Sequence, residues 1–224
     1  MNRARSRVVS GKRPKVFVDT NVLKFAATRL KRLRPRIETI EFDGWRDEVQ
    51  LHDIVEINPN ERIRNPELKA EADLLPQLAH LGTEMSVEFV IQLEAELESW
   101  GLPDMDSLGG RFYGCPLTLI DGPFRYSRVL FGGDFDAEER QFRFLTSIQE
   151  ARFLELQKVT GAYQGSRPIQ RNQLLDAFHL WCAEHAQCDY FLTLDFRLAK
   201  MVNGRTNVTP VQLVKPSELL ACTR

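Results

Sequence analysis

Three aspartates stand where a folded chain could gather them into one acidic site. Asp19 ends the apolar, β-branched segment 15–19, and Asp195 follows a second apolar segment, 190–193. Asp176 lies near the start of a helical segment that leads into this second strand. The carboxyl ends of parallel strands meet at one edge of a sheet, and a helix that leads into a strand begins at that edge. We therefore expect the three carboxylates to lie close together.

Clustered carboxylates repel one another unless a cation lies between them. Their hard oxygen atoms suit Mg²⁺ or Mn²⁺ better than zinc. Taken alone, each aspartate has an ordinary structural alternative as a helix cap or turn residue. Asp176, near a helix start, would also be stabilised by the helix dipole. The arrangement of all three therefore predicts a divalent metal site more strongly than any single residue does.

Two segments resemble the opening and closing motifs of the PIN-domain nucleases. Residues 16–23, VFVDTNVL, join an apolar strand to Asp, Thr and Asn and then to further apolar residues. Residues 176–195 place an Asp at a helix start and end the next strand in TLD. The resemblance covers residues 14–29 and 171–201 directly. It implies an α/β fold of the Rossmann-like three-layer α/β/α PIN type, with a mostly parallel sheet and an acidic pocket for one or two divalent ions.

The resemblance also implies a role for each matching residue. The family hydrolyses phosphodiester bonds, most often in RNA, with water activated by the metal. Asp19, Asp176 and Asp195 would be the metal ligands, and Asn21 and Thr193 would orient the carboxylates or the water by hydrogen bonds. The structural alternatives are a helix-start cap for Asn21 and a strand-end hydroxyl for Thr193.

The family uses a further acid on the helix after its second strand, and here the sequence departs from the pattern. The usual spacing points to Gln92 instead of a glutamate. The apolar stripe of a predicted helix at 88–100 puts Glu88, Gln92 and Glu96 on one flank and Glu94 on the other. We choose Glu88 because it would lie nearest the helix start, and we keep Glu96 and Glu94 as alternatives. The structural alternative for Glu88 is a glutamate on the solvent-exposed face of the helix.

Three other side chains could act at a nucleic-acid site. His179 follows Asp176 by three residues and could reach the pocket, although a packing role in the helix is favoured. Trp45 and Phe42 could stack on bases. We favour their packing against the domain.

The pattern predicts one elaborated domain over residues 14–224, after a flexible basic segment of residues 1–13. Two insertions interrupt it, a β-hairpin near 37–66 and a long loop near 101–136. Alternating strands and helices favour a mostly parallel sheet with helices on both faces. The hairpin strands are predicted at 37–42 and 50–57, the helices at 66–80, 88–100, 137–159, 171–186 and 196–201, and the other strands at 83–87, 190–193 and 208–213.

The net charge of the 224-residue chain is −1, but its distribution is uneven. Residues 1–36 hold twelve Lys or Arg and one acid, whereas residues 38–106 hold eighteen acids and four bases. The basic head is either a phosphate-contacting surface or a solvated tail. Without a long apolar run or signal segment, the sequence predicts a cytoplasmic protein that does not span a membrane, with its four cysteines as free thiols.

These features favour a metal-dependent endoribonuclease that acts on single-stranded or structured RNA. The alternative keeps the fold and drops catalysis, leaving a nucleic-acid-binding or scaffold module. A haloacid-dehalogenase-like phosphatase would need an acid at Asn21, and neither a P-loop nor a GxGxxG motif is present. Small bacterial PIN proteins are often toxins, so an antitoxin or other protein partner is left open, as is a homodimer.

Overall fold

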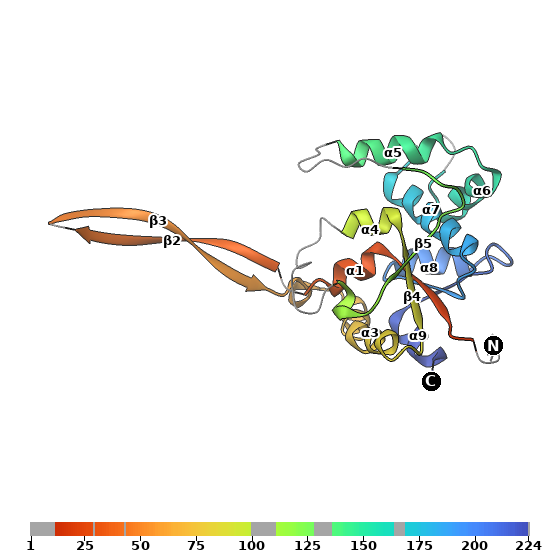
Figure 1. The fold of residues 1–224 in the computed structure, drawn as a ribbon, viewed down its shortest axis with the longest axis horizontal. Helices are drawn as coiled ribbons and strands as arrows, with labels where there is room; N and C mark the ends of the chain where they lie inside the picture. The colour runs from red at the N-terminus through yellow and green to blue at the C-terminus, as the bar shows by residue number, and fades with distance from the viewer. Residues whose placement is uncertain are drawn as a thin grey trace.

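The computed structural model shows an α/β domain from which one long β-hairpin projects (Figure 1). The predicted basic segment of residues 1–13 lies almost wholly outside the described residues. Within the described ranges, no helix combines the length and apolar character that crossing a membrane requires. The structure describes residues 12–28, 30–42, 44–99, 111–127, 136–163 and 169–223.

The domain is built on a five-stranded parallel sheet in the order β5-β4-β1-β6-β7. Its central strand, β1, is apolar and buried, as expected for a parallel strand covered on both faces. The prediction of a mostly parallel sheet is thus confirmed, and the architecture is compatible with a three-layer Rossmann-like fold. The strands are β1 (Lys15–Val18), β4 (Glu88–Gln92), β5 (Thr118–Ile120), β6 (Tyr190–Leu192) and β7 (Gln212–Val214).

Two hydrophobic cores cover the two faces of this sheet. Side chains alternate along β1, so that Phe17 enters one core while Val16 and Val18 enter the other. The Phe17 core is closed by α5 to α8, and the other by α1, α3, α4 and α9. The helices are α1 (Thr20–Ala26), α2 (Pro66–Ala72), α3 (Leu75–Thr83), α4 (Leu93–Ser99), α5 (Ala137–Ser147), α6 (Ala151–Thr160), α7 (Arg171–His185), α8 (Phe196–Asn203) and α9 (Pro216–Cys222).

The strand predicted at 83–87 and the helix predicted at 88–100 are both wrong in position. Thr83 ends α3, residues 88–92 form β4, and the helix begins only at Leu93. Phe89 and its two apolar successors are almost completely buried and pair with β1 and β5. A short apolar run of this kind fits a buried strand as well as a buried helix, and helical spacing alone does not distinguish them.

Other differences concern the ends of elements. The helix predicted at 66–80 is divided into α2 and α3, and the one at 137–159 into α5 and α6, because Ile148 leaves helical geometry. The predicted long loop at 101–136 contains the sheet strand β5 and a short 3-10 turn, Arg111–Gly114. The last strand, β7, begins four residues later than predicted. The four cysteines are free thiols, as expected, and three of them are buried.

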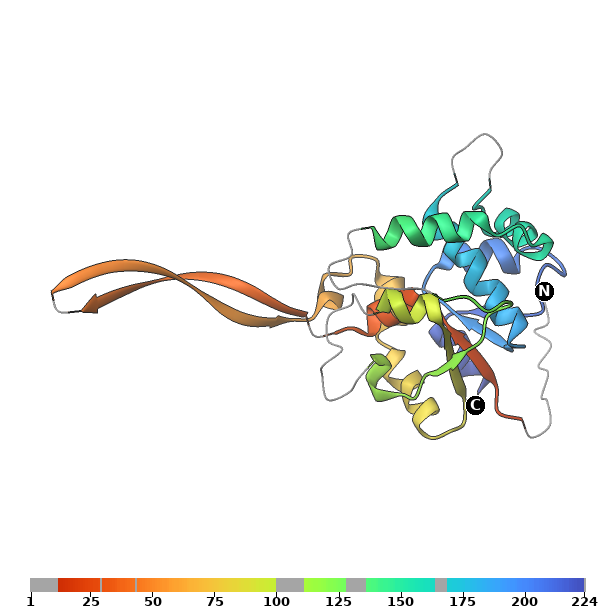
Figure 2. The same cartoon turned by 45° about the horizontal axis from the view of Figure 1, so that its top comes forward.

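The hairpin consists of β2 (Leu30–Phe42) and β3 (Trp45–Ile57), each 13 residues long. It starts well before the insertion predicted near 37–66 and pairs in continuous antiparallel register. Gly44 lies in the turn at φ +77°, a conformation that glycine adopts without strain. The ribbon points away from the domain in both views (Figures 1 and 2). Trp45 is 61% exposed, so it does not pack on the domain as favoured, and the Phe42 side chain lies outside the described part.

Candidate acidic site at the carboxyl edge of the sheet

Asp19 follows β1 directly and is almost completely buried. It occupies the N-cap position of α1, yet its side chain makes no capping hydrogen bond with the described residues. Instead, its Oδ2 accepts a hydrogen bond of 2.7 Å from the Thr193 hydroxyl, and its backbone N–H donates to Leu192 at the end of β6. The capping alternative therefore does not account for the Asp19 carboxylate.

Thr193 and Asn21 connect the ends of β1 and β6. The Thr193 hydroxyl, fully buried, accepts from Asn21 Nδ2 and from the backbone N–H of Asp195, each at 3.0 Å, while it donates to Asp19. Asn21 Oδ1 in turn accepts from the Leu194 N–H at 3.0 Å. Every hydrogen-bonding position of the hydroxyl is thus used, and the orientation of the Asp19 carboxylate is fixed by the neighbouring strand.

Asp195 and Asp176 reach the same edge from β6 and α7. Asp195 caps α8, because its Oδ1 accepts from the Leu198 N–H at 2.9 Å, so here the structural role is real. Asp176 lies in the second turn of α7, past the first turn where the helix dipole is strongest. Both side chains are half-buried.

The charges of these acids act on one another, so the carboxyl groups lie near one another. The pKa of the Asp19 carboxyl is raised to about 7, mainly by burial and also by the charges of Glu98 and Asp195, against the hydrogen bond from Thr193, which lowers it. Burial also raises the pKa of Asp176 to about 8, helped by Asp19, Asp195 and Glu98. Each carboxyl therefore opposes ionisation of the others.

Glu98 is the fourth acid of this group, and the sequence analysis missed it. It lies on α4, which packs against α1, and its pKa is raised mainly by burial, while contact with the Thr20 side chain and the charge of Arg171 lower it. Recognising residues 89–91 as strand would have moved the helix start to Leu93 and brought Glu98 into consideration.

Glu88, the residue chosen from the sequence, is in the wrong place. It begins β4 and pairs with Lys15 at the start of β1, whereas Asp19 follows the end of that strand. The amino and carboxyl edges of the sheet lie on opposite sides, so Glu88 does not join the aspartates. Glu88 was the wrong choice because residues 88–92 form a strand, so the helical spacing assumed for this segment does not apply.

Glu96 and Glu94, the alternatives to Glu88, also interact with other residues. Glu96 forms an ion pair with Arg111. Glu94 is fully buried, and its carboxylate accepts hydrogen bonds from Tyr126 at 3.1 Å and from Gln141 Nε2 at 2.7 Å. Gln141 Oε1 accepts in turn from Arg171 at 3.1 Å. Glu94 is therefore the anchor of a buried polar network.

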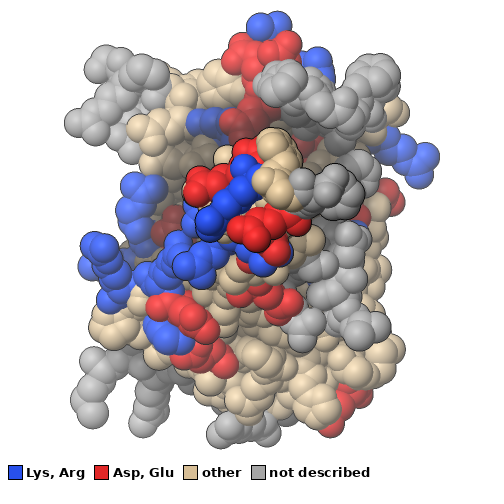
Figure 3. Space-filling model, turned by 90° about the vertical axis from the view of Figure 1, so that its left-hand side faces the viewer, with Lys and Arg blue, Asp and Glu red and all other residues tan. Residues whose placement is uncertain are grey.

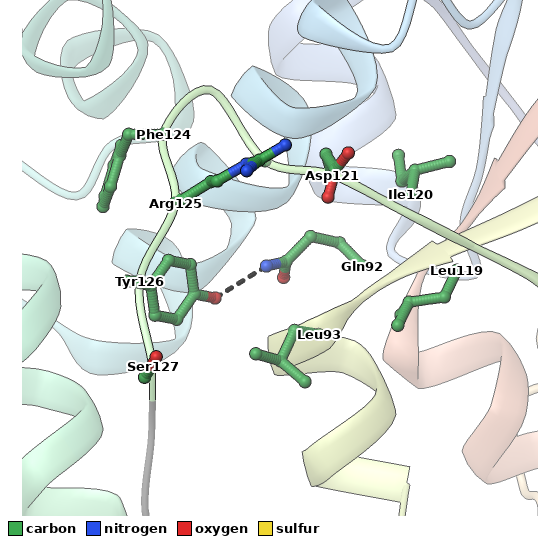
Figure 4. Close-up of a pocket in the computed structure, with 10 residues that line it drawn as sticks. Gln92, Leu93, Leu119, Ile120, Asp121, Phe124, Arg125, Tyr126 and Ser127 are labelled. Atoms are coloured by element: carbon green, nitrogen blue, oxygen red, sulfur yellow. Dashed lines mark hydrogen bonds between the residues drawn. The ribbon is translucent and has the colours of Figure 1, made fainter.

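That network borders a surface pocket of about 360 Å³ at the ends of β4 and β5 (Figure 4). Gln92 donates from Nε2 to the Tyr126 hydroxyl at 2.6 Å and accepts from the Glu94 N–H at 2.7 Å. Arg171, at the other end of the network, lies 3.6 Å from Glu98. The network thus positions the positively charged Arg171 side chain beside Glu98 and the other acids.

His179 is buried next to Asp19, in the kind of packing role that the sequence favoured. Its ring lies against Phe17 with centroids 5.7 Å apart, and its Nδ1 is 4.0 Å from Asp19 Oδ1. Complete burial lowers the pKa of His179 to about 4, so the ring is neutral near pH 7. Within the described part of the chain, His179 Nε2 is a buried polar atom without a hydrogen-bond partner.

The donor set fits a hard divalent cation in its chemistry. Four carboxylates from separate elements lie near one another, and the pKa values of Asp19, Asp176 and Glu98 are raised, mainly by burial and further by neighbouring negative charges. Among the described residues, however, no group of three Asp, Glu, His or Cys side chains is placed so that it could hold a metal ion.

Comparison of the chain with protein-family models, with curated proteins and with solved structures found no match.

Proposed function

We propose that this chain is a metal-dependent endoribonuclease of the PIN type, a cytoplasmic enzyme that hydrolyses phosphodiester bonds in single-stranded or structured RNA. The observation that carries the proposal is the convergence of four acids at the carboxyl edge of the sheet, two of them with a pKa raised to about 7 and about 8. Perturbed carboxyls gathered at such an edge are typical of functional sites.

Asp19, Asp176 and Asp195 would hold Mg²⁺ or Mn²⁺, and Glu98 replaces Glu88 as the fourth acid. When bound, the ion supplies an activated water and steadies negative charge on the phosphate. Thr193 and Asn21 act as positioning residues, because they fix the Asp19 carboxylate through direct hydrogen bonds.

Cationic side chains next to the acids suit a polyanionic substrate. Arg197, which is exposed on α8, lies close enough to lower the pKa of Asp176 by its charge. Arg171 does the same for Glu98. The guanidinium groups of Arg197 and Arg171 can contact phosphates that approach the acidic group. Figure 3 views the molecule from the side of the projecting hairpin, where Lys or Arg and Asp or Glu side chains are exposed together.

The competing proposal is a PIN-like binding or scaffold module without catalysis. It is favoured because, within the described part of the chain, no group of three Asp, Glu, His or Cys side chains is placed so that it could hold a metal ion. Both proposals allow an antitoxin or other protein to cover the acidic group. They differ in whether bound RNA is cleaved.

The test is Mn²⁺-dependent cleavage of a panel of single-stranded and hairpin RNAs, with matched glutamate variants. Glu98→Gln should reduce the cleavage rate by at least tenfold, about 1.4 kcal/mol in the barrier. Glu88→Gln, at the opposite edge of the sheet, should cleave like the wild type. RNA binding without cleavage by the wild type at any Mn²⁺ concentration would support the scaffold proposal. If the two variants cleave RNA at the same rate, Glu98 is not part of the catalytic site.

A further inference from the structure

The pocket at the ends of β4 and β5 is lined by residues that the proposed hydrolysis does not use. Its volume is about 360 Å³, enough for one nucleobase. Leu93, Leu119 and Ile120 give it an apolar surface, and Leu119 is 55% exposed. Its polar lining comes from Gln92, Asp121, Arg125 and Tyr126 (Figure 4). A concave surface of this mixed kind suits a small ligand with an apolar ring and polar edges.

The pocket lies one strand away from Asp19. β4 and β1 are parallel neighbours with Val90 opposite Phe17, and the same register places Gln92 level with Asp19. Neighbouring strands are about 4.8 Å apart. On its other side, Gln92 pairs with Ile120 of β5. A ligand in the pocket therefore lies within the length of one or two nucleotides of the acidic group.

Part of the pocket wall is fixed by hydrogen bonds between protein groups. Gln92 is only 1% exposed, and both ends of its amide are used, one by the Tyr126 hydroxyl and the other by the Glu94 N–H. The Tyr126 hydroxyl in turn donates to the Glu94 carboxylate. These side chains need no rearrangement to receive a ligand, so little ordering opposes binding.

The charges of the pocket favour a neutral ligand that has both donors and acceptors. Asp121 offers only acceptors and Arg125 only donors, and both line the pocket. A phosphate would meet the Asp121 carboxylate as well as the Arg125 guanidinium. A purely apolar ligand would leave both charged groups without a partner. A nucleobase has a neutral ring with donors and acceptors along its edges.

We propose that this pocket binds a guanine base of the RNA substrate. Guanine presents O6 and N7, the acceptor pair that an arginine contacts most often, and an amino group at N2 from which a carboxylate accepts. Adenine has a donor in place of O6, and uracil has no amino group. In single-stranded RNA these edges are free for contact. The source of the base rests on the proposed function, since RNA is the substrate proposed there.

The first experiment measures binding of mononucleotides to the full chain by NMR titration in the presence of a chelator. GMP should shift the side-chain amide signal of Gln92, with an affinity at least about tenfold above those of AMP, CMP and UMP. All four carry the same phosphate, so a difference in affinity reports on the base. IMP, which lacks the amino group at N2, should bind more weakly than GMP.

Two variants and a matched control assign the contacts. Asp121→Asn should weaken GMP by about tenfold and IMP by less, because the lost charge faces the amino group that IMP lacks. Arg125→Gln should weaken both nucleotides. Arg143→Gln changes an arginine that is 73% exposed on α5 and should leave GMP binding as in the wild type.

Equal affinity for all the mononucleotides would overturn the proposal, as would a Gln92 amide signal that GMP leaves unchanged. Inorganic phosphate that competes as well as GMP would show an anion site and would also overturn it. GMP binding that is insensitive to Asp121→Asn would remove the guanine contact.

The second experiment maps the cleavage positions of a mixed-sequence single-stranded RNA in Mn²⁺. The wild type should cut at a fixed position relative to G, and Asp121→Asn should lose this preference while it remains dependent on Mn²⁺. Guanine-selective binding without any cleavage would support the pocket and contradict the nuclease function. Metal-dependent cleavage without a preference for G would support the nuclease function and overturn the pocket as an RNA subsite.

Discussion

Replacing Asp19 with Asn should stabilise the metal-free protein at pH 8. Burial raises the pKa of Asp19 from 3.8 to about 7. At 1.36 kcal/mol for each unit, ionised Asp19 then costs the fold about 4 kcal/mol. Asn keeps an oxygen that can accept from Thr193, although a neutral acceptor weakens that bond by about 1 kcal/mol. We therefore expect a net gain of about 2–3 kcal/mol.

The size of this gain in stability depends on pH, which distinguishes the ionisation of Asp19 from other causes. Because the folded-state pKa is raised, the wild type binds a proton more tightly when folded, and its stability falls as pH rises from about 4 to about 7. At pH 5, wild-type Asp19 is already protonated in the folded state. The advantage of Asn over Asp should therefore be about 2–3 kcal/mol smaller at pH 5 than at pH 8.

Urea unfolding in the presence of a chelator, at pH 5 and pH 8, measures this difference. Asp121→Asn is the matched control, because Asp121 follows β5 at the same edge but is exposed. Its stability should stay within about 0.5 kcal/mol of the wild type at both pH values. An Asp19→Asn protein that is less stable at pH 8, or a difference that is the same at both pH values, would refute the reasoning.

Three further predictions concern the surroundings of Asp19. Thr193→Val leaves Asn21 Nδ2 and the Asp195 N–H without their acceptor, so it should cost about 2–4 kcal/mol in chemical unfolding, while Thr193→Ser should restore most of that loss. Mn²⁺ should raise the melting temperature more at pH 8 than at pH 5, because protons compete for carboxyls whose pKa values are about 7 and about 8; a melt that ignores millimolar Mn²⁺ at pH 8 contradicts this. His179 has its pKa lowered to about 4, so its contribution to stability is complete above pH 6.5 and is lost as pH falls toward 4. His179→Gln should therefore lose about 2–3 kcal/mol less than the wild type between pH 7 and pH 4.5, whereas exposed His52→Gln should behave like the wild type.

The parallel sheet and the edge that carries Asp19 and Asp195 were predictable from local sequence. Short apolar segments that end in polar residues and alternate with helices specify βαβ units, and their strand ends must share an edge. The predicted bounds of α7 and β6 agree closely with the structure, because the helix is long and the strand is short and continuous.

Glu98 and the hairpin length were not predictable in the same way. Residues 88–92 carry an apolar run that satisfies both strand and helix, and only pairing with β1 and β5 decides between them. β2 begins among alternating arginines that carry no burial pattern, because the ribbon is exposed on both faces. In both cases the deciding interactions are long-range contacts that a local pattern does not contain.

The most direct test of the central proposal is single-turnover cleavage of a single-stranded RNA by the wild type and by Asp19→Asn, first with Mn²⁺ and then with excess chelator. We predict metal-dependent cleavage by the wild type and a rate at least about 100-fold lower for Asp19→Asn, equivalent to about 2.7 kcal/mol in the barrier. Cleavage that persists in Asp19→Asn, or that is unaffected by the chelator, would contradict a metal-dependent nuclease site at Asp19.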